Sequence, residues 1–264
     1  MTKFISILLV VLTFSSCNEY QKALKNDEVS KKYAVSLKMY EAKKYSKAIR
    51  LFEQIAPLYR GKPQAENLFF MYSQSLYKTE QFYAAGYQFE SFSSSYPKSS
   101  KVEEASYLSA ICYTEMSPNY SLDQVDTNKA IDKLQRFIDD FPNSTYLPNA
   151  NDKIKILREK LEKKAFEVAK QYNTISDYKA ALVALDNFLI DFPGTPFKEK
   201  ALYYKFDSAY NLAINSINSK MKERLDNAKI ASVALLKFNA NTEFKSKVDT
   251  MLAKIETDLK QFSK

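Results

Sequence analysis

Apolar residues recur along the chain in one frame. The stretch Ala130–Pro142, AIDKLQRFIDDFP, begins with Ala, carries Leu four residues later and Phe at seven, and ends in Phe-Pro. Ala181–Pro193 repeats this frame, Ala85–Pro97 keeps it with aromatic residues, and Ala48–Tyr59 follows it more loosely. Positions i, i+4, i+7 and i+11 lie on one face of an α-helix, and a proline stops the helix soon afterwards. The pattern therefore predicts a helix with one buried face, present in at least four copies.

A helix that recurs with the same end is typical of proteins built from stacked helical hairpins. Another amphipathic segment precedes each copy, so we predict an all-α solenoid of about five tetratricopeptide-like hairpins with a C-terminal capping helix. The expected pairs are 33–40 with 48–59, 64–79 with 83–95, 101–116 with 128–140, 150–172 with 178–191, and 201–213 with 223–238, followed by a cap over 243–262. An insertion, SPNYSLDQVDT, separates the helices of the third pair.

Small residues support the hairpin prediction, because the first helix of a tetratricopeptide hairpin needs one for close approach to its neighbour. The first four predicted hairpins supply Ser36, Ser73, Ala110 and Ala169 at that position. Asp207 falls near the same position in the fifth hairpin, and the pattern gives no reason for a charged residue there.

Composition argues against an enzyme. The chain has 264 residues but no His, which is the commonest general base and a frequent metal ligand, and it has only 3 Gly. Its two cysteines, Cys17 and Cys112, are too few for a zinc site without histidine. Asp139 and Asp140 are neighbours on a helix and point apart, so they do not form a catalytic carboxylate pair. We therefore expect no catalytic residue, no cofactor and no metal.

The N-terminus predicts export and lipidation. Residues 1–16 hold one Lys, an apolar run too short to span a membrane, and small residues before Cys17, as in a secretory signal. Ser15-Ser16-Cys17 resembles a bacterial lipobox, in which cleavage precedes an acylated Cys. We expect three acyl chains on Cys17 and a tether over 17–30. An ordinary signal peptide with an incidental Cys is the alternative.

Aromatic residues on the predicted first helices suggest a groove. The candidates share the side expected to be concave, and they are Tyr33, Tyr40, Phe70, Tyr77, Lys78 and Tyr107. Such a groove suits an extended peptide that ends in an aromatic residue and a free carboxylate. The alternative is that these tyrosines pack between hairpins with their hydroxyl groups in water.

One long segment carries a family resemblance. Asp140–Tyr172 runs from DFPNS into a long helix, with leucines four residues apart at Leu157 and Leu161, and ends in Ala-Lys-Gln-Tyr. This resembles the BamD family of outer-membrane protein assembly lipoproteins, in which a Tyr stands where this chain has Phe141. The resemblance extends over the whole chain, and the insertion after Met116 is also where the family carries one.

The resemblance implies a non-enzymatic subunit of the machinery that assembles β-barrels in the outer membrane. It implies that repeats one to three, over 31–149, meet the C-terminal strand of unfolded outer-membrane proteins. Repeats four and five with the cap, over 150–264, would dock the POTRA domains of the barrel protein BamA. The lipid anchor would hold the chain on the periplasmic face of the outer membrane, and nucleic acid is not an expected partner.

Charge agrees with this division, because the excess of Lys and Arg over acidic residues lies mainly after residue 150. Basic surface speeds association with an acidic partner. The expected docking residues are Lys153, Arg158, Lys220, Lys222 and Arg224.

Two other functions remain open from sequence. Glycan-binding lipoproteins of the SusD type also use tetratricopeptide hairpins, but they stack sugars on Trp, and this chain has none. A periplasmic tetratricopeptide scaffold is the second, although such scaffolds usually carry an N-terminal coiled coil, for which the stretch before residue 33 is too short.

Overall fold

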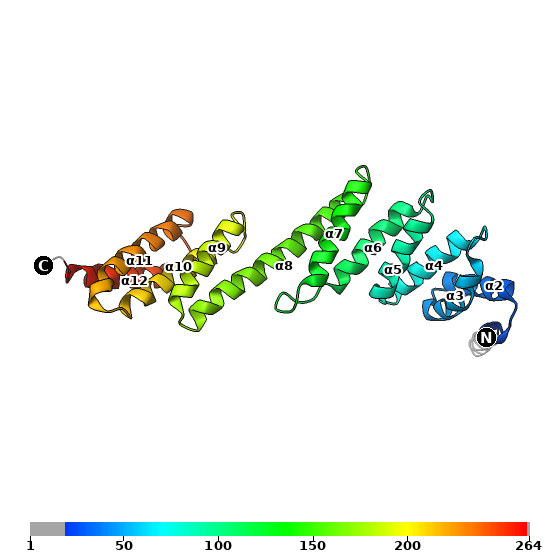
Figure 1. The fold of residues 1–264 in the computed structure, drawn as a ribbon, viewed down its shortest axis with the longest axis horizontal. Helices are drawn as coiled ribbons and strands as arrows, with labels where there is room; N and C mark the ends of the chain where they lie inside the picture. Colours follow the sequence, from blue (N-terminus) through cyan, green and yellow to red (C-terminus); the bar gives the residue numbers. More distant parts are fainter. Residues whose placement is uncertain (1–18, 263–264) are drawn as a thin grey trace, which may run out of the picture. The chain divides into compact units, whose positions relative to one another are not determined.

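The computed structural model describes residues 19–262, and over these residues it contains α-helices and no strand (Figure 1). The helices are α2 (Val29–Glu41), α3 (Tyr45–Tyr59), α4 (Ala65–Lys78), α5 (Phe82–Ser95), α6 (Val102–Met116), α7 (Val125–Asp140), α8 (Leu147–Thr174), α9 (Tyr178–Asp191), α10 (Lys198–Ile214), α11 (Asn218–Phe238) and α12 (Lys245–Lys260). Successive helices pair as the repeat frame requires, and α12 packs on α11 as the cap. The predicted all-α fold of tetratricopeptide-like hairpins is confirmed.

The chain forms two compact units. Unit 1 comprises residues up to Pro118 together with Asp123–Lys155, and unit 2 comprises Asn119–Leu122 and Ile156–Lys264. The boundary falls inside α8, a few residues after the division expected at residue 150. Because α8 is 28 residues long, its first turns belong to the core of unit 1 and its later turns to the core of unit 2.

The repeat frame is the core of both units. Its first-position alanines are fully buried, and they are Ala48, Ala85, Ala130 and Ala181. The apolar residues four and seven positions later are buried in every copy as well. A fifth copy begins at Ala228 in α11, with Ser232 and Leu235 also fully buried. The sequence pattern did not reveal this copy, because Ser232 stands where the other copies carry an apolar residue.

Asp207 on α10 accepts hydrogen bonds from residues of both α8 and α10. Its carboxylate accepts hydrogen bonds from Asn173 Nδ2 at 2.7 Å and from Asn211 Nδ2 at 3.2 Å. The neighbouring Ser208 is fully buried and also accepts from Asn173 at 3.0 Å. The charged residue is therefore part of a hydrogen-bonded contact between two first helices.

A hydrogen bond recurs between successive hairpins. A Glu in the first turn of a first helix accepts from a Ser or Thr in the loop that precedes the next first helix. The pairs are Glu66 with Ser99 at 2.6 Å, Glu103 with Ser144 at 2.6 Å, and Glu199 with Thr242 at 2.5 Å. Each hydroxyl oxygen also accepts from a backbone N–H two residues later, so one side chain joins two hairpins.

The N-terminal end differs from the tether expected over 17–30. Residues 19–25 form a helix, and its Tyr20 and Ala23 are buried in the first hydrophobic core of unit 1. Lys47 Nζ lies 5.1 Å from the centre of the Tyr20 ring. Leu24 also packs against this core and Glu19 pairs with Lys38 at 2.5 Å, so a short helix docks here although the surrounding sequence is polar. The predicted signal peptide and Cys17 lie outside the described residues.

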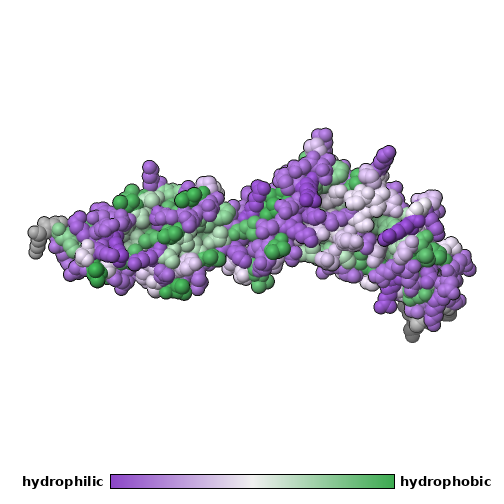
Figure 2. All heavy atoms as spheres, viewed as in Figure 1, coloured by the Kyte–Doolittle hydropathy of each residue, from purple (hydrophilic) through white to green (hydrophobic). Residues whose placement is uncertain are grey.

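Hydrophilic residues cover most of the face seen in Figure 2, with hydrophobic residues in scattered patches. Among the described helices, none combines the length and the apolar character that crossing a membrane requires.

Candidate functional site

The first helices of unit 1 share a row of tyrosines. Tyr40 comes from α2, Tyr77 from α4 and Tyr107 from α6, and each is half-buried. Burial raises the pKa of all three hydroxyl groups above the ordinary tyrosine value, so they are neutral at neutral pH. Together with the polar neighbours Gln74, Glu104 and Tyr146 these tyrosines form what we call the aromatic face.

A side-chain relay joins three helices at one end of this face. Tyr40 donates a hydrogen bond from its hydroxyl to Gln74 Oε1. The amide nitrogen of Gln74 then donates to Glu104 Oε1 at 3.2 Å. The relay holds α2, α4 and α6 in register and leaves the second oxygen of Glu104 available to a ligand donor.

A stacked pair forms the centre of the aromatic face. The Tyr107 ring lies parallel to the Tyr146 ring, with 4.2 Å between centroids and 11° between planes. The Tyr107 hydroxyl donates to Asn149 Oδ1 at 2.7 Å. Tyr146 lies just before α8, so the stack fastens the start of α8 to α6. Aromatic pairs of this geometry stabilise by about 0.5–1.5 kcal/mol beyond area burial.

Tyr77 and the charged residues beside it complete the row. Its ring meets Phe82 edge-on at 5.9 Å, and Lys78 Nζ lies 5.7 Å from the ring centre. Lys78 is exposed, so its ammonium group can reach a carboxylate laid across the aromatic face. Nearby, Glu115 forms an ion pair with Lys153 at 3.8 Å.

Two of the expected groove residues pack against other aromatic rings. Phe70 is only 4% exposed and packs against Phe89 and Phe92 in the core, so its assignment to an open groove is wrong. Tyr33 is half-buried and stacks on Tyr59 at 5.0 Å at the edge of the first core. Both residues were expected in the groove because aromatic residues on a first helix look alike in the sequence, whichever distant rings cover them.

Sequence reasoning missed Gln74, Glu104 and Tyr146. A usable signal exists for Tyr146, because it lies two residues after Ser144, the hydroxyl that bonds Glu103. Phe197 and Phe244 hold the same position after Thr195 and Thr242, and both stack on the preceding first helix. Gln74 and Glu104 follow no repeated spacing in the sequence that would identify them.

The face offers recognition and not covalent chemistry. Among residues 19–262 the one thiol is that of Cys112, which is fully buried, and burial raises its pKa to about 12. Its other groups are tyrosine hydroxyls, amides, one Glu and one Lys. No cluster of His, Cys, Asp or Glu among residues 19–262 could hold a metal ion.

The expected docking residues divide between the units. Lys153 lies in unit 1, where it pairs with Glu115 as described. In unit 2, Arg158 on α8 and Lys220 on α11 are exposed, and Lys222 pairs with Asp226 at 3.3 Å on the α11 surface. Arg224 is half-buried and donates to Ser216 Oγ, so part of its hydrogen-bonding capacity holds the α10–α11 loop.

Comparison with known proteins agrees with this architecture. The chain matches the YfiO family, described as outer membrane lipoprotein, over residues 25–225. It is 26% identical over 222 residues to the outer membrane protein assembly factor BamD of Rickettsia prowazekii, covering 81% of this chain and 86% of the relative. The BamD of Buchnera aphidicola is 26% identical over 237 residues, covering 83% and 94%. The BamD of Caulobacter vibrioides is 22% identical over 171 residues, covering 65% and 56%.

The family match spans all of unit 1 from α2 onward and unit 2 as far as the first turns of α11, and it therefore includes the aromatic face. The chain belongs to the YfiO family of outer membrane lipoproteins.

Proposed function

We propose that this chain is a non-enzymatic subunit of the machinery that assembles β-barrel proteins in the outer membrane. In this role, unit 1 binds the C-terminal strand of unfolded outer-membrane proteins, and unit 2 docks a BamA-like barrel protein through its POTRA domains. Family membership and the three relatives named as outer membrane protein assembly factors support the general role.

The observation that carries the peptide-binding part is the Tyr107–Tyr146 stack with its neighbours. It presents half-buried aromatic surface beside unfilled hydrogen-bonding positions on Glu104 and beside the free ammonium group of Lys78. An extended strand that ends in an aromatic residue would bury its ring against this surface. Its terminal carboxylate would meet Lys78, and its backbone N–H groups would donate to the face. Burial of one aromatic side chain contributes about 1.5–3 kcal/mol.

The proposed docking role of unit 2 is supported by its excess of basic residues. Arg158 and Lys220 are exposed, and the excess of basic residues lies in this part of the sequence. A basic surface would attract an acidic POTRA face and raise the association rate. Acylation of Cys17, after removal of residues 1–16, would keep both units at the periplasmic face of the outer membrane.

Co-purification from solubilised membranes tests the general role. The lipidated chain, extracted in mild detergent, should bring down a barrel protein that carries POTRA domains. A sugar transporter in its place would indicate a SusD-like protein, and a cell-wall enzyme would indicate a periplasmic scaffold. Either result would overturn the proposal.

Lipidation has its own test. Intact mass of the extracted protein should show a chain that starts at Cys17 and carries acyl groups. A chain that retains residues 1–16, or an unmodified Cys17, would refute the anchor. A Cys17→Ser variant should be released from the membrane fraction or remain unprocessed.

A further inference from the structure

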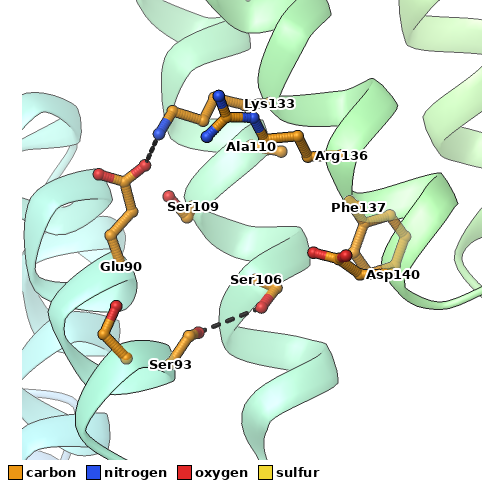
Figure 3. Close-up of a pocket in the computed structure, with 10 residues that line it drawn as sticks. Glu90, Ser93, Ser106, Ser109, Ala110, Lys133, Arg136, Phe137 and Asp140 are labelled. Carbon is orange, nitrogen blue, oxygen red and sulfur yellow. Dashed lines mark hydrogen bonds and ion pairs between the residues drawn. The ribbon is translucent and has the colours of Figure 1, made fainter. Parts of the chain in front are cut away.

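A polar slot opens in unit 1, and its lining includes none of the residues that define the aromatic face. It lies between α5 and α7, with α6 as its floor, and its volume is about 360 Å³ (Figure 3). Serines make up much of its surface, and they are Ser93 and Ser94 from α5 with Ser106 and Ser109 from α6. Ser93 and Ser106 share a hydrogen bond of 3.1 Å across the floor.

The repeat frame shows that this junction is unusual. Ser93 lies eight residues after Ala85, and Ser106 lies three residues after Glu103. The corresponding pair is Ala56 with Phe69 at the α3–α4 junction, and Leu189 with Leu202 at the α9–α10 junction. Both of those pairs pack within hydrophobic clusters. At α5–α6 two serines replace an apolar pair and give the slot a hydroxyl-lined floor, whereas a cavity of about 450 Å³ at the preceding junction is lined by Phe69 at the position of Ser106. The polar floor and the charged residues of α7, rather than the cavity itself, distinguish this junction, and buried polar positions in a repeat core are where function is expected.

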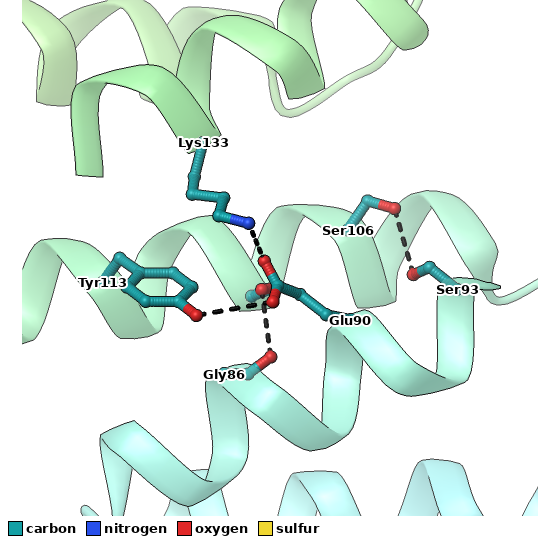
Figure 4. Close-up of polar contacts among 7 residues, drawn as sticks. Gly86, Glu90, Ser93, Ser106, Tyr113 and Lys133 are labelled. Carbon is teal, nitrogen blue, oxygen red and sulfur yellow. Dashed lines mark hydrogen bonds and ion pairs between the residues drawn. The ribbon is translucent and has the colours of Figure 1, made fainter. Parts of the chain in front are cut away.

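One end of the slot is held in place by an ion pair. Glu90 on α5 accepts from Lys133 on α7 and from the Tyr113 hydroxyl at 3.4 Å (Figure 4). Lys133 and Lys129 also lie 5.3 and 4.6 Å from the centre of the Tyr113 ring. Close packing of α5 on α6 at Gly86 supports this end, because a Cβ there would lie 3.2 Å from the Cβ of Cys112. The charges of Glu90 and Lys133 are thus already matched.

Two charged side chains at the slot, those of Arg136 and Asp140, lack an ion-pair partner among the described residues. Arg136 and Asp140 both line the slot from α7, and within residues 19–262 neither forms an ion pair. Figure 3 shows the Arg136 guanidinium group extending toward the Lys133 end and the Asp140 carboxylate pointing into the slot near Ser106. A free cation and a free anion therefore lie at separate positions along one small polar cavity.

We propose that this slot binds a small zwitterion of amino-acid to dipeptide size. The carboxylate of the ligand would pair with the forked guanidinium group of Arg136, which suits planar carboxylates. Its ammonium group would donate to Asp140, and the serine hydroxyls would bond the polar atoms between the two ends. The volume lies at the lower end of the range for small-molecule sites, which is consistent with a ligand of this size. This site is separate from peptide binding on the aromatic face and from partner docking.

Nuclear magnetic resonance of the full mature chain, made soluble by Cys17→Ser, tests the proposal with glycylglycine as the probe. The Arg136 Nε–H signal, assigned by its loss in Arg136→Gln, should shift and saturate as glycylglycine is added. N-acetyl-glycylglycine lacks the ammonium group and glycylglycinamide lacks the carboxylate, so each should bind about tenfold more weakly or worse. Arg136→Gln and Asp140→Asn should weaken glycylglycine binding by a similar factor. Arg50→Gln and Asp132→Asn change matched exposed residues outside the slot and should have no effect.

Filling the slot gives an independent test. Ser93→Ala with Ser106→Leu restores an apolar pair like the one at the α3–α4 junction. This double variant should abolish binding while its unfolding temperature stays the same or rises. The proposal is overturned if glycylglycine moves no slot resonance at about 50 mM, or if the filled variant or the two charge variants still bind it normally. The proposal is also overturned if N-acetyl-glycylglycine and glycylglycinamide, which each keep one charged end, bind as tightly as glycylglycine. That result would indicate a site for a single ion.

Discussion

The two units place an aromatic stack at the same point of the repeat but expose it differently. In unit 1, Tyr107 and Tyr146 remain half-buried beside hydrogen-bonding groups. In unit 2, the corresponding pair is Tyr203 and Phe244, with centroids 3.9 Å apart, and Tyr203 is only 5% exposed. Burial raises the pKa of Tyr203 to about 12. The same repeat position thus contributes to a surface in one unit and to the core in the other.

This difference shows how a repeat protein acquires function. Frame residues such as Ala85 and Ala181 are buried alike in both units and determine the fold. Residues between the frame positions differ between the two units, and they supply the tyrosine row of unit 1 and the basic residues of unit 2. The predictions below separate these two classes of residue, from the largest expected effect to the smallest.

Frame substitutions should be costly in both units. Phe89→Ala in unit 1 should lower the free energy of unfolding by about 3–5 kcal/mol, and Leu185→Ala in unit 2 by about 2–5 kcal/mol, because each leaves a cavity in a fully buried site. Urea unfolding followed by circular dichroism measures both. Exposed Tyr83→Ala on α5 is the control and should cost under 1 kcal/mol. A small loss at either frame position would show that the frame does not form the core of that unit.

Substitutions in the aromatic stacks should separate binding from stability. Tyr77→Ala with Tyr107→Ala should weaken binding of a barrel-protein C-terminal peptide tenfold or more, while helicity stays unchanged. Tyr203→Ala should destabilise unit 2 and leave peptide affinity unaltered, since its ring is covered by Phe244. Fluorescence anisotropy with a labelled peptide and thermal unfolding provide the two readouts. The comparison fails if Tyr203→Ala weakens peptide binding as much as the double variant does.

Salt should affect partner docking more than peptide binding. Raising salt from about 0.05 to 0.5 M should slow association of the mature chain with the partner's POTRA region several-fold, with less effect on dissociation. Lys220→Glu with Lys222→Glu should slow association at low salt and weaken its salt dependence. Lys78→Glu on unit 1 is the matched control and should leave POTRA association unchanged. Docking that is indifferent to salt would show that the basic excess serves solubility alone.

The smallest expected effect is the loss of folding stability at low pH when Glu199 becomes protonated. Hydrogen bonds from Thr242 and then Asn239 lower the pKa of Glu199 below its ordinary value. Its contribution to stability is therefore present above about pH 4.5 and is lost as pH falls through the folded-state pKa. Between pH 6 and 3.5 the wild-type urea midpoint should fall more than that of Glu199→Gln. Exposed Glu223→Gln should follow the wild type, and equal slopes for all three would contradict the role of the inter-hairpin bond.

The sequence was sufficient to predict the hairpins, because buried frame residues recur with fixed spacing and prolines fix the helix ends. It was not sufficient to tell that Tyr107 is half-exposed and Phe70 is buried, because both lie four residues after a first-turn Glu. Phe70 turns into the core because Phe89 and Phe92 receive it, whereas Tyr107 meets Tyr146 from a loop 39 residues later. Such pairings depend on distant segments and leave no periodic trace. The helix at 19–25 was missed for a similar reason, since the contacts of Tyr20, Ala23 and Leu24 with the first core are made to residues of α2 and α3 and form no repeat in the sequence.

Site-specific photocrosslinking in cells tests the division of labour most directly. A photoreactive residue at exposed position Lys78 in unit 1 should trap unfolded outer-membrane proteins during assembly, and one at exposed position Lys220 in unit 2 should trap the POTRA-bearing barrel protein. Tyr77→Ala with Tyr107→Ala should reduce the first crosslink and preserve the second. Crosslinks to unfolded substrates from Lys220, with only the barrel partner trapped at Lys78, would contradict the assignment of the two units.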